Sequence, residues 1–374
     1  MNICIFSEYA YSLLKKEGDI IGGAELQMVN LARGLSKRSH NVSFVVFEKP
    51  SYSFEEIDGI SVYNPFNLNN SGYSYLKPKN IYFLIKALNK IDSDIFIQRA
   101  GTPLTGILSI YAKLNKKIFL YSVASDDDVS DYLRIRSVKD LKRVLYITGV
   151  WFSTCVICQS INQKKSLIEY SEKIKCEIIK NMLTSEINNY ERNNNPDTDA
   201  LWVGRCDKIK RPEIFINLAK KLPNLKFKMI CRLSIDPEFY HKISQLANET
   251  SNLEFLGFVP HEEIYKYYLQ SKMLVCTSLM EGFPNTFLEA WVHGMPVVSL
   301  GIDPDGIISK YNLGICSRNF DELVNGIKIL SKDIDLREKI CLNSREYIFN
   351  EHSIDKTLDR YEYVLSKYYS TNKV

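Results

Sequence analysis

The sequence lacks any apolar run that could span a membrane. The longest candidate, Val144–Cys158, is interrupted by polar residues and falls short of the roughly 18 apolar residues that a spanning helix needs. No basic stretch precedes the segment Asn2–Phe6, so we expect a strand there and not a secretory signal peptide. Short repeats and low-complexity tracts are missing as well. These features predict a cytoplasmic globular protein.

The sequence also lacks the pattern of a disulfide framework or a metal site. Its nine cysteines, an odd number, fall mostly in apolar runs, which is typical of buried thiols in a reducing compartment. Cys155 and Cys158 form a single C-x-x-C, but none of the five histidines is nearby. We favour structural cysteines over a metal or redox pair. No carboxylate motif for a divalent metal is found, and we expect neither a metal nor an organic cofactor.

Length and composition indicate two globular domains. The 374 residues correspond to two domains at roughly 100–200 residues each. Hydrophobic residues make up 45% and charged residues 25%, which excludes disordered, collagen-like and coiled-coil chains. Residues 1–183 carry a net charge of +6 and the remainder −2. The basic first part suits an anionic membrane surface or substrate, but its charge is too small to indicate nucleic acid.

Short apolar runs alternate with amphipathic segments in the first half. Met28, Leu31, Ala32 and Leu35 recur at helical spacing. The expected strands are Asn2–Phe6, Val42–Phe47, Ile60–Tyr63, Ile95–Gln98, Lys117–Ser122, Cys155–Cys158 and Glu177–Lys180. Apolar strands separated by helices predict a parallel sheet covered on both faces.

A second alternation predicts another doubly wound domain. Its expected strands are Ala200–Val203, Phe227–Cys231, Leu253–Leu256, Met273–Thr277, Pro296–Leu300 and Leu313–Cys316. An asparagine-rich segment with few apolar residues precedes it and indicates a linker. The predicted boundaries are a first domain over 1–183, a linker over 184–198, a second domain over 199–352 and a terminal amphipathic helix over 353–374. We expect the site in the cleft between the domains, at the carboxyl ends of the strands.

The densest chemical signals follow the strand Met273–Thr277. Pro284 fits the first turn of a helix that Gly294 ends. The N–H groups that open such a helix form an anion site, and here they belong to Asn285, Thr286 and Phe287. Glu281 and Glu289 lie eight positions apart across this helix start, so they would address different parts of one bound molecule. An ordinary loop charge and a solvated helix charge are the alternatives.

These residues resemble a known family. Glu281, Glu289-Ala290 and Gly294-x-Pro296-Val297-Val298 resemble the retaining glycosyltransferases of family four, the glycosyl transferases group 1. Three further segments resemble the same family, in its order along nearly the whole chain: Gly22-Gly23-Ala24-Glu25, Val203-Gly204-Arg205 with Lys210, and Phe255–Val259. The resemblance implies an α/β chain of GT-B architecture, with two doubly wound Rossmann-like domains, an interdomain cleft and a terminal helix that crosses back to the N-terminal domain.

The resemblance implies phosphate ligands for a nucleotide-sugar donor. Arg205 would offer a planar fork to two phosphate oxygens, and Lys210 a point charge. Gly22 and Gly23 would let backbone amides approach the donor closely, because they lack a Cβ. Without the family context, Arg205 and Lys210 could belong to an ordinary basic loop.

The resemblance also assigns the rest of the donor. Glu289 would accept hydrogen bonds from the two ribose hydroxyls, and Glu281 would orient the transferred sugar. The base would lie near Arg232 and the backbone of Phe258 and Val259.

Three positions depart from the family pattern. Many members carry a histidine where this chain has Tyr121–Asp128. Asp126 is the expected substitute and Ser125 the next candidate, although an acidic triplet is also typical of a solvated loop or a helix N-cap. The family's glycine after the lysine is Arg211, and its usual Gly-Leu pair is Pro284-Asn285. These changes bear on the identity of the donor sugar.

Two further segments have open interpretations. Arg99 ends an expected strand and would contact an acceptor or a phosphate, or form a structural ion pair. The basic and aromatic segment Leu133–Phe152 suits an anionic membrane surface, but a domain helix with a solvated basic side is the favoured alternative.

The sequence therefore predicts a cytoplasmic, metal-independent, retaining glycosyltransferase. It would move a hexose or N-acetylhexosamine from a UDP- or GDP-sugar to a hydroxyl of a surface glycan or lipid-linked acceptor, with peripheral membrane contact left open. The alternatives are a non-catalytic nucleotide-sugar sensor or assembly scaffold, and a sugar epimerase of the same fold.

Overall fold

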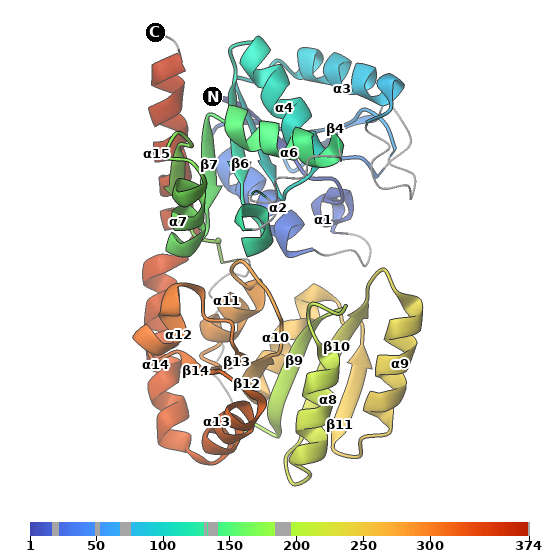
Figure 1. Cartoon of the computed structure of the whole chain (residues 1–374), viewed down its shortest axis with the longest axis vertical. Helices are drawn as coiled ribbons and strands as arrows, with labels where there is room; N and C mark the ends of the chain where they lie inside the picture. Colours follow the sequence, from blue (N-terminus) through green and yellow to red (C-terminus); the bar gives the residue numbers. More distant parts are fainter. Residues whose placement is uncertain are drawn as a thin grey trace. The chain divides into compact units, whose positions relative to one another are not determined.

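The structure is a computed structural model that describes residues 1–16, 22–48, 53–67, 76–130, 133, 141–183 and 196–372. The chain divides into two compact units, Met1–Thr184 with Ile354–Val374, and Ser185–Ser353 (Figure 1). Each unit is built around one sheet and is considered by itself. Among the described helices, none is both long and apolar enough to cross a membrane.

The first unit contains an eight-stranded sheet in the order β3-β4-β2-β1-β5-β6-β7-β8. Its strands are β1 (Asn2–Phe6), β2 (Asn41–Val45), β3 (Ser53–Ile57), β4 (Ile60–Asn64), β5 (Ile95–Arg99), β6 (Ile118–Ser122), β7 (Cys155–Cys158) and β8 (Cys176–Ile178). Neighbouring strands pair in parallel except β3, which forms an antiparallel hairpin with β4 at the edge. The predicted parallel sheet is therefore confirmed apart from this hairpin. The strand order reverses between β1 and β5, so the loops that follow these two strands diverge.

Helices cover both faces of this sheet because successive strand residues point to opposite sides. Ile3 and Ile5 of β1 enter one core, and Cys4 and Phe6 enter the other. Three helices cover the first face: α1 (Tyr11–Lys15), α2 (Gly23–Lys37) and α15 (Ile354–Asn372). Four helices cover the second face: α3 (Pro78–Ile91), α4 (Pro103–Leu114), α6 (Leu141–Phe152) and α7 (Ile161–Tyr170). Cys155 and Cys158 also belong to opposite cores, so these two thiols cannot share one metal ion.

The terminal helix α15 is an integral part of the first unit. Its apolar residues at helical spacing are all buried: Leu358, Tyr361, Val364, Leu365 and Tyr368. Arg38, the C-cap residue of α2, reaches three acidic side chains of α15, at 2.5 Å from Asp359, 2.7 Å from Glu362 and 3.0 Å from Asp355. A segment far away in the sequence thus completes the core beside β1.

The second unit contains a six-stranded parallel sheet in the order β11-β10-β9-β12-β13-β14. Its strands are β9 (Thr198–Cys206), β10 (Phe227–Leu233), β11 (Leu253–Gly257), β12 (Ser271–Cys276), β13 (Val297–Leu300) and β14 (Gly314–Ser317). One face is covered by α8 (Pro212–Lys221), α9 (Pro237–Asn248) and α13 (Phe320–Lys332), and the other by α10 (His261–Leu269) and α11 (Asn285–Val292). The helix α14 (Ile334–Glu351) packs on α11 and α13. This is the doubly wound order of dinucleotide-binding folds, with its reversal between β9 and β12.

Candidate functional site

The loops after β9 and β12 are fastened together where the strand order of the second unit reverses. Thr277 makes the link: its Oγ1 accepts a hydrogen bond from Trp202 Nε1 at 2.9 Å and donates one to the carbonyl of Lys210 at 2.7 Å. The N–H of Leu279 donates to the carbonyl of Ile209 at 2.7 Å. The two loops therefore form one rigid surface at the carboxyl edge of the sheet.

Arg211, which replaces the family's glycine, takes a glycine-like backbone. Its φ is 50° and its ψ 55°, at the N-cap of α8. A residue with a Cβ pays about 1–2 kcal/mol for this left-handed conformation. Its guanidinium donates hydrogen bonds to the carbonyls of Thr277 at 2.6 Å and Ser278 at 3.0 Å. These charged bonds offset the strain and tie the two loops together a second time.

The structure brings together two predicted site residues, Lys210 and Glu281. Both Lys210 Nζ and Ser278 Oγ donate to Oε1 of Glu281, the hydroxyl at 2.6 Å. The side chains of Lys210 and Glu281 keep exposed fractions of 24% and 14%, so the ion pair is accessible at the surface. Ser278 was not predicted, although its position directly after an expected strand was a signal for it.

Two arginines stand side by side at the ends of β9 and β10. Arg205 is the register partner of Arg232, so their side chains start from adjacent positions. The Arg205 side chain is half exposed and lies 3.4 Å from Asp207, its weak ion-pair partner. Like charges at such positions repel unless an anion lies between them, which makes this edge suited to phosphate groups.

The helix α11 opens one residue later than expected. Pro284 is its N-cap and not its first residue. Asn285 and Thr286 occupy the first two positions, whose backbone N–H groups have no acceptor within the helix. The expectation for Phe287 is wrong, because its N–H donates to the carbonyl of Pro284 at 3.1 Å.

Glu289 is buried in a hydrogen-bonded network. Tyr268 OH donates to its Oε2 at 2.7 Å, and His261 Nε2 lies 3.2 Å from its Oε1. Burial alone would raise the pKa of Glu289, but the bonds from His261 and Tyr268 outweigh it and lower that pKa. In turn, burial disfavours a charged His261, yet Glu289 raises the pKa of His261 above its ordinary value. The network favours an ionised carboxylate.

The segment predicted to hold the base is continuous with this network. Phe258 and Val259 follow β11 and lead directly to His261, the first residue of α10. Sequence reasoning missed His261 and Tyr268. His261 lies two positions after the Phe255–Val259 motif, and this short distance was the available signal for it.

In the first unit, Gly22 and Gly23 are the N-cap and first residue of α2. A Cβ on Gly22 would collide with the carboxylate of Glu25, in the first turn of the same helix. Because Glu25 brings a negative charge to this helix start, the site that was predicted for a phosphate also contains a carboxylate of the chain itself.

The acidic triplet is largely engaged by the chain. Asp126 Oδ1 accepts a hydrogen bond from Gln163 Nε2 at 2.8 Å. Ser125 is the N-cap of a short 3₁₀ helix, Asp126–Val129, and Asp128 accepts from the N–H groups of Ala124 and Ser125 at 2.8 and 3.2 Å. The N-cap alternative therefore describes Ser125 and Asp128.

Arg99 is buried, with an exposed fraction of 9%. Its guanidinium donates to Asn181 Oδ1 at 2.8 Å, so the partner is a neutral amide and not the carboxylate of an ion pair. Burial lowers the pKa of Arg99.

A cavity of about 120 Å³ lies beside Arg99, at the carboxyl ends of β1 and β5. Glu8, Glu25 and Gln98 line it, and sequence analysis selected none of these three as site residues. Burial, and then the charge of Glu25, raise the pKa of Glu8 to about 7, and a hydrogen bond from Thr102 partly opposes this. The cavity therefore contains a carboxyl group that titrates near neutral pH.

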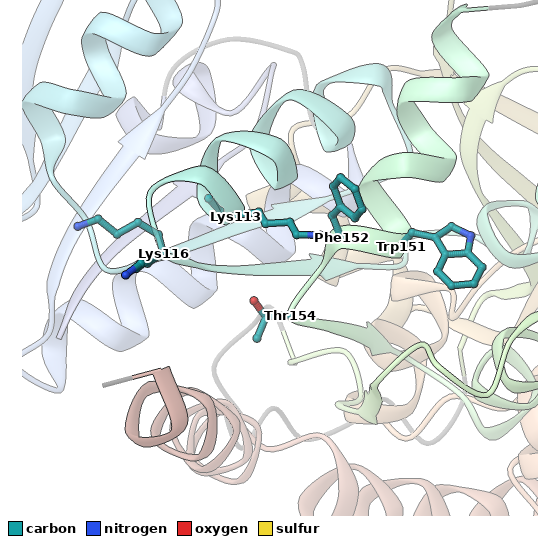
Figure 2. A pocket seen from close by; sticks show the side chains of 7 residues that line it. Lys113, Lys116, Trp151, Phe152 and Thr154 are labelled. Carbon is teal, nitrogen blue, oxygen red and sulfur yellow. The ribbon is translucent and has the colours of Figure 1, made fainter. Parts of the chain in front are cut away.

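A second pocket lies at the opposite edge of the same sheet. It is lined by Lys113, Lys116, Lys117, Trp151 and Phe152, with Ala112 and Thr154. Figure 2 shows Lys113 extended toward Phe152, and its Nζ lies 3.7 Å from the centre of that ring. Trp151 and Phe152 are 43% and 41% exposed, so a basic and aromatic surface is open to solvent here.

The segment Leu133–Phe152 is divided by the fold. Residues 134–140 lie outside the described part of the chain. Within α6, Arg143 and Tyr146 are buried, whereas Leu141 and Val144 are exposed.

Gly106 of α4 and Gly149 of α6 allow these helices to pack closely, since a Cβ on either would meet the backbone of the other helix.

Comparison with known proteins identifies the class. The model of glycosyltransferase family 4 matches residues 21–185, and the model of glycosyl transferases group 1 matches residues 184–347. With two Rossmann-like units, these matches define a glycosyltransferase of GT-B fold. The chain belongs to the family-four, group 1 glycosyltransferases, and the resemblance seen in its sequence is confirmed.

Individual proteins agree with this assignment. An uncharacterised glycosyltransferase of Haemophilus influenzae is 24% identical over 92% of this chain and 96% of its own. CapH of Staphylococcus aureus, a capsular polysaccharide biosynthesis glycosyltransferase, is 24% identical over 78% and 81%. Sucrose-phosphate synthase of Thermosynechococcus elongatus has a TM-score of 0.78 at 16% identity over 99% of both chains. Anabaena HepE with UDP-glucose has a TM-score of 0.72 at 16% identity over 98% and 99%.

The strained backbone of Arg211 gives a first prediction. Arg211→Ala should lower the free energy of unfolding by about 2 kcal/mol, because it loses the bonds to two carbonyls and keeps the strain. Arg211→Gly should cost about 1 kcal/mol less, because glycine relieves the strain. Urea unfolding followed by tryptophan fluorescence measures both, with the exposed Arg318→Ala as the control. Equal losses for alanine and glycine would contradict the strain argument.

The pKa of Glu8 gives a second prediction. Because that pKa is raised from 4.5 to about 7, the folded state binds more protons between these values, and stability falls as pH rises through them. Glu8→Gln should therefore match the wild type near pH 4 and exceed it at pH 8 by up to about 3 kcal/mol. Urea unfolding across this pH range measures the difference. The control variant Glu56→Gln, at an exposed position of β3, should show no such pH dependence. An effect of Glu8→Gln on stability that does not change with pH would contradict the raised pKa of Glu8.

Proposed function

We propose that the chain is a retaining, metal-independent glycosyltransferase. It moves a hexose or N-acetylhexosamine from a UDP- or GDP-sugar to a hydroxyl of a glycan or lipid-linked acceptor. The observation that carries the proposal is the joining of Lys210, Ser278 and Glu281 where the second sheet reverses its strand order, in a chain of this family. The UDP-glucose bound by HepE and the capsular role of CapH support a nucleotide-sugar donor and a glycan product.

The diphosphate of the donor binds to cations and backbone N–H groups. Arg205 and Lys210 supply the charge, and the start of α11 at Asn285 and Thr286 supplies the N–H groups. These groups stabilise the negative charge that grows on the leaving diphosphate, which is the task that a divalent metal performs in other transferases.

The nucleoside binds along α10 and α11. The Glu289 carboxylate has about four lone-pair sites. His261 occupies one lone-pair site on Oε1 and Tyr268 occupies one on Oε2, so each oxygen keeps a lone-pair site for a ribose hydroxyl. The base lies near Arg232 and the segment Phe258–Val259, which is tied to Glu289 through His261.

Glu281 and Asp126 act at the transferred sugar. Glu281 accepts hydrogen bonds from sugar hydroxyls, and its charge favours the positive charge that develops at the anomeric carbon. Asp126 and Ser125 take the place of the family's histidine at the far end of the sugar. The acceptor hydroxyl attacks from the face of the leaving group and passes its proton to the departing phosphate, so configuration is retained without a protein nucleophile.

The two glutamates give the decisive test. Glu281→Gln should keep or tighten nucleoside diphosphate binding, because Lys210 loses its ion-pair partner and can bind the phosphate instead. The rate of sugar transfer by the same variant should fall about 10²–10³-fold. Glu289→Gln should weaken the diphosphate itself, because a charged acceptor of two hydroxyls becomes a neutral one. Calorimetry with UDP and GDP, beside turnover with donor and acceptor, measures both.

The controls separate the alternatives. Tyr268→Phe removes one donor to Glu289 and should weaken the diphosphate less than Glu289→Gln does. Conversion of the nucleotide sugar to another nucleotide sugar without an acceptor would favour an epimerase. Binding with no release under any condition would favour the sensor or scaffold.

We also infer peripheral contact with an anionic membrane through Lys113, Lys116, Trp151 and Phe152. The two lysines attract the phosphate headgroups of anionic lipids, and the exposed rings of Trp151 and Phe152 suit the boundary between membrane and water. The double variant K113E/K116E should lose binding to vesicles with 30 mol% (about one-third) anionic phosphatidylglycerol in a co-sedimentation assay. The exposed Lys242→Glu should not. Equal binding to neutral vesicles, or full binding by the double variant, would remove this surface from the proposal.

A further inference from the structure

Arg211 carries a positive charge that its neighbours in the chain do not neutralise. Its guanidinium donates hydrogen bonds to two neutral acceptors, the carbonyls of Thr277 and Ser278. Within the described part of the chain, no carboxylate forms an ion pair with it. A carbonyl orients a guanidinium but does not cancel its charge, so the charge of Arg211 remains available to an anion.

The two carbonyls occupy only one edge of this guanidinium. Nε donates at 2.6 Å and Nη2 at 3.0 Å, which uses two of the five N–H groups of an arginine. The outer edge consists of both N–H groups of Nη1 and the second N–H group of Nη2. Among the described residues, none accepts a hydrogen bond from Nη1, and this atom is open to solvent because Arg211 is partly exposed. Such an edge matches two oxygen atoms of one phosphate group.

The contacts of Ser278 place Arg211 beside the candidate donor site. Its carbonyl accepts from Arg211 at 3.0 Å, and its hydroxyl donates to Glu281 at 2.6 Å. Because both groups belong to one residue, the guanidinium and the Glu281 carboxylate lie close together. Lys210, which also donates to Glu281, is the residue that precedes Arg211 in the chain.

The two cations already assigned to the diphosphate have anionic partners in the chain. Lys210 pairs with Glu281, and Arg205 lies 3.4 Å from Asp207. A phosphate that binds either cation has to share it with a carboxylate. At Arg211 a phosphate meets no such competitor, so attraction to this residue is not reduced by a neighbouring negative charge.

We propose that Arg211 is a third cationic ligand of the donor, and that its outer edge binds two oxygens of the phosphate that carries the sugar. This phosphate is the expected one because Ser278 joins Arg211 to Glu281, the residue proposed to act at the transferred sugar. The carbonyls on the inner edge fix the direction of the guanidinium before the donor binds. The inference rests on the proposed transferase function and adds a donor ligand where the family has glycine.

The test compares nucleotides that differ only in the second phosphate. Arg211→Gly should stay folded, because glycine readily adopts the left-handed backbone of this position. By calorimetry it should bind UDP or GDP about 10–100-fold more weakly than the wild type, because a charged two-point contact is lost. UMP and GMP lack the sugar-bearing phosphate, so their affinities should not change. An equal loss for monophosphate and diphosphate would overturn the assignment, since a general loosening of the loops would weaken both.

Two further variants separate the contact from net charge. Lys208→Ala removes one positive charge from an exposed position of the same loop, and salt screening should leave its diphosphate affinity close to that of the wild type. Arg211→Lys keeps the charge without the planar fork and should recover only part of the affinity lost in Arg211→Gly. A loss in Lys208→Ala as large as that in Arg211→Gly would show that only net charge matters, and would overturn the proposal.

Inorganic pyrophosphate separates this outcome from that of the transferase proposal, because it is a diphosphate without a nucleoside. If the wild type binds pyrophosphate but neither UDP nor GDP, the transferase is rejected. Weaker pyrophosphate binding by Arg211→Gly would then still support Arg211 as an anion ligand. Equal affinities of wild type and Arg211→Gly for the nucleoside diphosphate would keep the transferase and reject Arg211. No binding of any of these anions would reject both.

Discussion

The candidate donor site depends on one constraint, the fastening of the loop after β9 to the loop after β12. At a reversal of strand order, two loops diverge and leave backbone groups without ladder partners. Here the carbonyls of Thr277 and Ser278 accept from Arg211, and the carbonyl of Lys210 accepts from Thr277. Lys210 immediately precedes Arg211, so the bonds that satisfy the backbone also place the candidate catalytic cation beside Glu281. The left-handed backbone of Arg211 is the local cost of this arrangement.

Two predicted site residues of the second unit, Glu281 and Glu289, are each paired with a basic side chain. Lys210 is paired with Glu281, and His261 with Glu289. Pairing avoids the desolvation penalty of an isolated buried charge, and it fixes each side chain in one orientation. In the proposed donor complex, a diphosphate at Lys210 would exchange one anionic partner for another, so little reorganisation would be needed. Arg205, half exposed and weakly paired, has more freedom to meet the ligand first.

The sequence predicted the strands well because their apolar runs are buried on both faces. It predicted the terminal helix for the same reason, since five apolar residues at helical spacing require a core. The edge strand β3 was missed because Ser53–Ile57 is only half buried. A signal existed: Asp58 and Gly59, with φ of 51° and 74°, form the two-residue turn between β3 and β4 that Asp-Gly favours.

The candidate site was predictable only where chemistry and spacing coincide in one segment. Glu281, Lys210 and Arg205 could be selected because their motifs are local. Tyr268, one of the two partners of Glu289, could not, because it reaches Glu289 from another helix. Arg99 ends a strand, which suggested a side chain open to ligands, but its burial against Asn181 depends on a segment 82 positions away. Long-range contacts of this kind follow from topology and leave no periodic signal.

The distribution of charge illustrates the same limit more sharply. The first half of the chain has a net positive charge, which suggested an anionic ligand. The fold places Lys113, Lys116 and Lys117 at the amino end of β6, and places Glu8 and Glu25 at the carboxyl ends of the central strands, where ligands bind. The net charge of a domain thus describes its surface on average, whereas the charge at the reversal of strand order determines which ligand can bind. Cations lie at the reversal in the second unit and carboxylates at the reversal in the first, so the two reversals favour ligands of different charge.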